Sequence, residues 1–128
     1  MEGPKRVAVV EDDAGMSQAL ARILRLAGYQ AATFVSAEAL IRDEGGAATD
    51  CLVLDVQLPG MSGFELHAHL VRAGTPAPVI FITAYDDAEA QALAVRANAL
   101  YLAKPFTGKT LIEAVARALA STVLKNGY

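Results

Sequence analysis

The sequence predicts an α/β domain in which helices cover both faces of a doubly wound, five-stranded parallel sheet. Five short apolar runs are nearly continuous rather than alternating, which is typical of strands buried on both faces. Segments with helical spacing lie between the runs, so that strand and helix alternate along the whole chain. The expected strands cover residues 7–10, 31–35, 51–54, 79–83 and 100–103.

Local signals mark where the helices between these runs begin and end. Gly28 can end the first helix in the left-handed conformation, and Asn98 stands where a fourth helix should end. Residues 62–65 read Ser-Gly-Phe-Glu, a capping box that predicts the start of a third helix. Two apolar stripes are expected in the core, with part of the second as an alternative dimer face: Met16, Leu20, Ile23, Leu24 and Ala27, and Leu111, Val115, Leu119 and Val123.

Length and composition indicate one globular domain. The chain has 128 residues, 54% of them hydrophobic, which excludes a disordered chain. A net charge of −3 argues against binding nucleic acid over the whole surface. No segment approaches the ~20 apolar residues of a membrane span, and the single cysteine, Cys51, points to a reducing compartment. We therefore expect a cytoplasmic, soluble domain over 1–128 with its core at about 6–120. Residues 121–128 would form the end of the last helix or the start of a linker.

Polar residues follow four of the five runs, at what should be one edge of the sheet. Glu11 and Asp12 follow the first run, Asp55 the third, Thr83 ends the fourth and Lys104 follows the fifth. Two carboxylates ~4 Å apart repel by about 4 kcal/mol at an effective dielectric of 20, so the acids need a cation or protons. Oxygen ligands favour a hard ion such as Mg²⁺. With Lys104, such an ion could neutralise a phosphoryl group approaching Asp55, which could itself be the nucleophile.

Four motifs carry a resemblance that covers about residues 7–119. They are 9–13 (Val-Val-Glu-Asp-Asp), 55–63 (Asp-Val-Gln-Leu-Pro-Gly-Met-Ser-Gly), 81–84 (Phe-Ile-Thr-Ala) and 101–106 (Tyr-Leu-Ala-Lys-Pro-Phe). In this order they resemble the receiver domain of two-component response regulators. The loop 58–63 and the segment 78–83 are most similar to the FixJ-type branch. The resemblance implies a flavodoxin-like fold with strand order 2-1-3-4-5.

The resemblance also implies a role for each residue of the acidic site. Asp55 would accept a phosphoryl group from a sensor histidine kinase. Glu11, Asp12, Asp55 and the backbone carbonyl of Gln57 would hold Mg²⁺, for which Mn²⁺ could substitute. Lys104 would pair with the phosphoryl oxygens, with a cis bond to the proline that follows it. The domain would be an enzyme only in catalysing its own phosphorylation and dephosphorylation.

Thr83 and Tyr101 would form the switch of such a domain. Phosphorylation would draw Thr83 inward, and Tyr101 would rotate into the space left. The surface of the fourth helix, fifth strand and fifth helix would then regulate an output domain or partner, expected to be transcriptional. A phosphorylation-dependent homodimer is a further alternative, and we expect no direct contact with nucleic acid or membrane.

Several residues allow other interpretations. Asp13 is expected to cap the first helix, with an outer-shell metal role as the alternative. Tyr85, two residues after Thr83, is expected to slow phosphoryl hydrolysis. His67 and His69 lie two apart on the third helix, so they should face different directions and not share a metal.

Three other functions are alternatives to this one. The segment 103–110 resembles a nucleotide-binding loop, but Ala103 replaces its first glycine and Thr107 is expected to be a helix cap. A haloacid dehalogenase-type phosphatase would need Asp where Gln57 stands. The remaining alternative is a receiver-like scaffold that binds partners without phosphorylation, although the acids, the phosphoacceptor and the lysine are all present.

Overall fold

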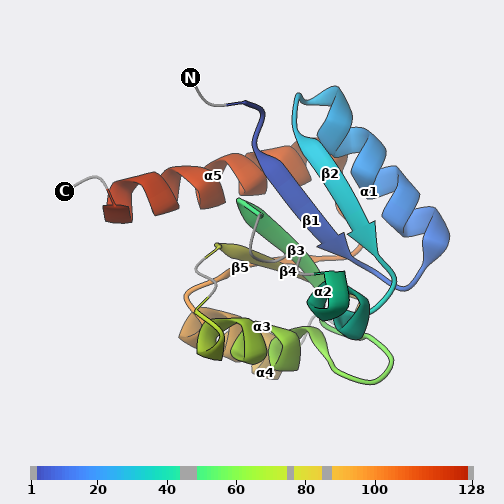
Figure 1. Ribbon diagram of the computed structural model, residues 1–128, viewed down its shortest axis with the longest axis vertical. Helices are drawn as coiled ribbons and strands as arrows, with labels where there is room; N and C mark the ends of the chain where they lie inside the picture. Colours follow the sequence, from blue (N-terminus) through green and yellow to red (C-terminus); the bar gives the residue numbers. More distant parts are fainter. Residues whose placement is uncertain (1–2, 44–48, 75–76, 85–87, 127–128) are drawn as a thin grey trace.

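The structure is a computed structural model that describes residues 3–43, 49–74, 77–84 and 88–126. Five parallel strands form one sheet in the order β2-β1-β3-β4-β5, as the sequence predicts, and helices cover both of its faces (Figure 1). The strands are β1 (Arg6–Val10), β2 (Gln30–Phe34), β3 (Cys51–Asp55), β4 (Val79–Thr83) and β5 (Leu100–Ala103). The helices are α1 (Ala14–Leu26), α2 (Ala37–Asp43), α3 (Gly63–Arg72), α4 (Ala88–Arg96) and α5 (Gly108–Asn126).

Alternate residues of the strands enter two separate cores. Val7 and Val9 of β1 pack with α1 and α5, whereas Ala8 and Val10 face the core shared with α2, α3 and α4. This division explains the continuous apolar runs, because both faces of the central strands are covered. Cys51 belongs to the core with α1 and α5, where burial raises the pKa of its thiol to about 12.

Burial is not uniform across the sheet. Residues of β3 and β4 are all buried, and those of β1 are buried after Arg6. The two edge strands, β2 and β5, contain no buried residue, although their apolar runs look similar in the sequence. An edge strand has only one neighbour, so the continuous pattern overstated the burial of these two strands.

The residues expected to start or end helices do so in the structure. Ser62 and Glu65 form a capping box at the start of α3, in which the Ser62 Oγ accepts from the Glu65 amide at 3.1 Å. Gly28 and Asn98 both have positive φ, at 98° and 57°. Leu20 and Leu24 of α1, like Leu111 and Val115 of α5, are buried, whereas Ala27 is exposed. The side chain of Val123 lies outside the described ones.

None of the helices in the described ranges combines the length and the apolar character that a membrane crossing requires.

Candidate functional site

The sheet register brings the predicted site residues together at one edge. Val10 pairs with Leu54, so the next residues lie side by side: Glu11 just after β1, and Asp55 at the end of β3. Asp55 in turn pairs with Ile82, which places Thr83 one residue further along β4. Thr83 pairs with Ala103, the last residue before Lys104. The expectation of one polar cluster at the carboxyl ends of the strands is therefore confirmed.

Three carboxylates form the centre of the cluster. One oxygen each from Glu11, Asp12 and Asp55 lies within 4.8 Å of the other two. Glu11 and Asp55 are only 1% and 3% exposed, whereas Asp12 faces solvent. Water can screen little of the repulsion between the two buried acids, so a neighbouring cation has to balance it.

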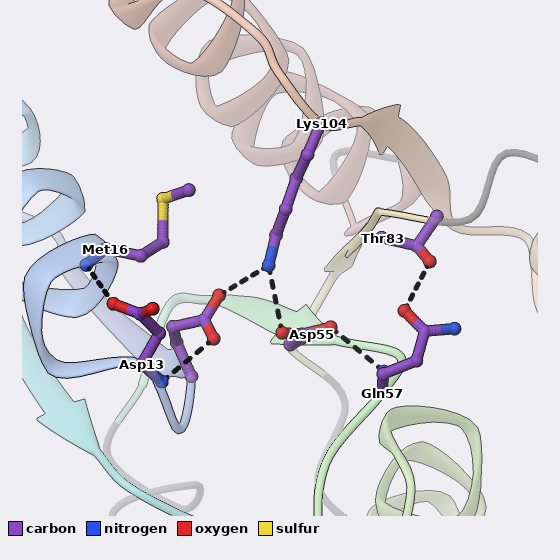
Figure 2. A network of polar contacts seen from close by, with 7 residues as sticks. Asp13, Met16, Asp55, Gln57, Thr83 and Lys104 are labelled. Carbon is purple, nitrogen blue, oxygen red and sulfur yellow. Dashed lines mark hydrogen bonds and ion pairs between the residues drawn. The ribbon is translucent and has the colours of Figure 1, made fainter.

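Lys104 supplies positive charge between the two buried acids. Its Nζ donates to Glu11 Oε1 at 2.8 Å and to Asp55 Oδ2 at 3.0 Å (Figure 2). Burial by itself would lower the pKa of the Lys104 ammonium, but hydrogen bonds and charge attraction from Glu11 and Asp55 outweigh it and raise that pKa. One ammonium faces three carboxylates, so the cluster still carries excess negative charge.

Backbone amides orient the two buried carboxylates. The Asp13 N–H donates to Glu11 Oε2 at 3.1 Å, and the Gln57 N–H donates to Asp55 Oδ1 at 2.9 Å. Each carboxylate therefore has one oxygen bonded to the amide two residues ahead and the other to Lys104 (Figure 2). The Lys104 backbone N–H donates to the Thr83 carbonyl at 2.7 Å, and the bond to Pro105 is cis, as expected.

Asp13 belongs to the start of α1 rather than to the centre of the cluster. Its Oδ1 accepts from the Met16 amide at 2.9 Å, the bond of a helix N-cap. The interpretation of Asp13 as the helix cap is therefore confirmed. Thr107 likewise caps the start of α5, accepting from the Thr110 amide at 3.1 Å.

The side chain of Gln57 contributes a contact that sequence reasoning missed. Thr83 is fully buried, and its hydroxyl donates to the Gln57 Oε1 at 2.6 Å. The sequence suggested a carbonyl role for Gln57 and a place beside the phosphorylation pocket but no bond to Thr83, because no pattern predicts which way an exposed amide side chain turns. Tyr101, the second predicted switch residue, is half-buried one strand away and pairs with Phe81.

Glu38 of α2 is a second residue that the sequence did not point to. Its Oε2 accepts from the Met61 amide at 3.2 Å, in the loop between β3 and α3. Gly60 in the same loop has a φ of 75°, and a Cβ there would approach Glu38 Oε2 to 2.9 Å. Glu38 therefore holds the loop that follows Asp55 and Gln57 from a helix 23 residues away.

The donor set fits a divalent cation. It contains only oxygen ligands, with two buried acids and one solvent-facing acid, and one lysine does not balance them. Mg²⁺ is commonly bound through one or two carboxylates while it keeps waters for a phosphate oxygen.

His67 of α3 lies against Phe81, with the two ring centroids 5.7 Å apart, and burial lowers the pKa of His67. Tyr85 lies outside the described residues.

Comparison with known proteins decides the family. The response regulator receiver domain matches residues 7–116. The chain belongs to this family. It is 38% identical over 113 residues to Nodulation protein W of Bradyrhizobium diazoefficiens, covering 88% of this chain and 50% of that protein. It is 36% identical over 115 residues to the transcriptional regulatory protein TdiR of Thauera aromatica, covering 89% and 51%.

Structural comparison agrees with this assignment. The crystal structure of FixJ-N superposes with a TM-score of 0.83 at 31% identity, covering 93% of this chain and 96% of that one. Both the receiver fold and the similarity to the FixJ branch are therefore confirmed. The receiver domain spans about half the length of the two curated relatives. It is a signalling domain of two-component response regulators, and its relatives include transcriptional regulators.

Proposed function

We propose that this receiver domain accepts a phosphoryl group on Asp55 from a sensor histidine kinase, in a reaction that depends on Mg²⁺. One observation carries the proposal: the buried Asp55 carboxylate lies 3.0 Å from the Lys104 ammonium, inside a cluster of three carboxylates. A buried nucleophile beside a fixed cation and an excess of oxygen ligands suits phosphoryl transfer, which depends mainly on positioning and charge.

Transfer would need little motion of the chain. An Asp55 oxygen forms the new P–O bond while the P–N bond to the kinase histidine breaks, and that electron pair returns to the imidazole nitrogen. Lys104 would leave its ion pair with Asp55 and donate to a phosphoryl oxygen. The Gln57 amide would keep the carboxylate oriented through its 2.9 Å bond to Oδ1.

Mg²⁺ would be held by Glu11, Asp12, Asp55 and the Gln57 carbonyl, with Mn²⁺ as a substitute. When bound, the ion neutralises charge on the transferring phosphoryl group. Asp13 would act only in the outer shell, because its carboxylate already caps α1. Lys104 already forms ion pairs with both buried acids, so the bound ion would add to the positive charge that the lysine supplies.

The output of phosphorylation would be a changed surface of α4, β5 and α5. Thr83 and Tyr101 lie on the neighbouring strands β4 and β5, which lead to that surface. Because the relatives are about twice as long and include a transcriptional regulator, we expect a transcriptional output domain or partner, in the cytoplasm. A phosphorylation-dependent homodimer is an alternative form of the same output, and no direct contact with nucleic acid or membrane is expected of this domain.

Intact mass spectrometry after incubation with Mg²⁺ and acetyl phosphate tests the proposal. The wild-type protein should gain one phosphoryl group, and the isosteric variant Asp55→Asn should gain none. Beryllofluoride with Mg²⁺ provides a second test, because some receiver domains do not react with small donors. Failure in both tests, with no shift of the Asp55, Thr83 and Tyr101 amide resonances, would leave a scaffold that acts without phosphorylation.

A further inference from the structure

Gln57 connects the phosphoacceptor to the switch threonine through two different groups. Its backbone N–H donates to Asp55 Oδ1 at 2.9 Å, and its side-chain Oε1 accepts from the Thr83 hydroxyl at 2.6 Å. Figure 2 shows the Gln57 side chain extending from beside Asp55 to the hydroxyl of Thr83. The backbone bond orients Gln57, and the side chain then reaches across to β4.

A threonine hydroxyl carries a single proton and can donate only one hydrogen bond at a time. In this structure the proton of Thr83 is committed to Gln57. The hydroxyl therefore cannot donate to a group on Asp55 until this bond breaks. We propose that the Gln57 side chain is a latch: a positioning residue that holds the Thr83 hydroxyl and opposes the switch. This inference rests on the proposed phosphorylation of Asp55.

The two partners differ in burial, and this difference allows the bond between them to open. Thr83 is fully buried, so its hydroxyl needs a protein or ligand partner at every stage. Gln57 is exposed, and its amide can bind water as soon as Thr83 leaves. Opening the latch therefore leaves no unsatisfied buried group, provided that a new acceptor appears near Asp55.

A phosphoryl group on Asp55 would be that acceptor. Its oxygens are charged, and hydrogen bonds to charged oxygens are stronger than those to a neutral amide. The Thr83 proton would therefore transfer its bond from Gln57 to the phosphoryl group. Before phosphorylation the latch favours the unswitched state, so its removal should favour binding of a phosphoryl mimic.

The test measures the affinity for beryllofluoride in the presence of Mg²⁺, in a double-mutant cycle. Gln57→Met keeps the length of the side chain and the backbone bond to Asp55 but removes the amide oxygen. We expect it to tighten beryllofluoride binding about fivefold. In a Thr83→Val background, where no hydroxyl exists to be held, the same change should have almost no effect.

The free protein provides a signature that a merely structural role would not change. Three-bond couplings to the Thr83 methyl group should report a different χ1 distribution in Gln57→Met than in the wild type. Equal beryllofluoride affinity of Gln57→Met and wild type would overturn the latch, as would an equal effect in the Thr83→Val background. If the wild type binds no beryllofluoride at all, the proposed function itself fails, which is a different result.

Discussion

The turns after β1 and after β3 each adjoin an acid of the site, Glu11 and Asp55, and both lead into a helix, yet they are held in different ways. The first is short, and Asp13 within it caps α1. The second passes through residues 56–62 and is held by Glu38 from α2, by Val56 bonded to the Ile82 carbonyl, and by Gly63 bonded to the Val56 carbonyl. Near Asp13 the first turn is held by bonds within three residues, although the Glu11 amide also bonds to the Phe34 carbonyl. The second turn depends more on distant elements, because the Glu38 side chain of α2 also bonds to it.

Glycines at the two helix starts show this difference most clearly, and substituting them should have the largest effect. A Cβ at Gly63 would clash with the Asp55 carbonyl oxygen, a backbone atom that cannot move away alone. We expect Gly63→Ala to lower the free energy of unfolding by about 3 kcal/mol. At Gly15 the nearest atom, Asp13 Oδ1, is 3.4 Å away, so Gly15→Ala should raise stability by about 0.5 kcal/mol.

Urea unfolding followed by circular dichroism measures both variants. The Gly15→Ala protein is the matched control, because it adds the same methyl group at the other helix start. Equal losses of stability in the two variants would show that the second turn is no more tightly packed than the first.

Lys104 joins the two turns by charge, and its removal should have the next largest effect. Lys104→Met leaves Glu11 and Asp55, both buried, without their cation. We expect a loss of about 2 kcal/mol in EDTA, below the 3–5 kcal/mol typical of a buried pair because the lysine is partly exposed. Mg²⁺ should restore part of this loss, since it can replace the missing positive charge.

Exposed Lys109 on α5 provides the control for this substitution. Lys109→Met removes the same charge from the chain and should change stability by no more than about 0.5 kcal/mol. Unfolding of both variants in EDTA and in Mg²⁺ separates the effects. A Lys104→Met protein as stable in EDTA as Lys109→Met would mean that the ion pairs do not hold the turns together.

A smaller effect should come from α3, the helix after the second turn, and it should make the free energy of unfolding depend on pH. His67 on this helix packs against Phe81, and burial lowers its pKa. At a pH between the folded and unfolded pKa values of His67, the unfolded chain binds more protons than the folded one. The contribution of His67 to the free energy of unfolding is therefore fully present above about pH 6.5 and decreases as the pH falls below it. We therefore expect the free energy of unfolding to decline slightly between pH 7 and 5.5.

His67→Gln should be less stable than the wild type at pH 7, and the difference should narrow as the pH falls. His69→Gln on the same helix leaves the His67–Phe81 contact in place and should keep the wild-type decline. Urea midpoints measured at half-unit pH steps would show this. A constant difference between wild type and His67→Gln would show that the contact with Phe81 does not disfavour protonation.

The strands, the helix caps and the edge of the sheet that holds the site could all be predicted from the sequence alone. Continuous apolar runs predicted the five strands to within about a residue of their observed bounds, because burial on both faces leaves little room for polar side chains. The parallel alternation of strand and helix then placed Glu11, Asp55, Thr83 and Lys104 at one edge. The caps at Asp13, Ser62 and Thr107 were also readable, since they are contacts within three residues.

The contacts that tune the site were decided only by the tertiary structure. Glu38 meets Met61 across 23 residues, and Gln57 meets Thr83 across 26. Neither pair has a characteristic spacing, because the approach depends on how α2 and β4 pack around the second turn. The partial exposure of the edge strands β2 and β5 was likewise not predicted, because their apolar runs resemble those of the buried strands. Which polar side chains meet, and which apolar faces remain partly open, depends on the neighbours that folding supplies.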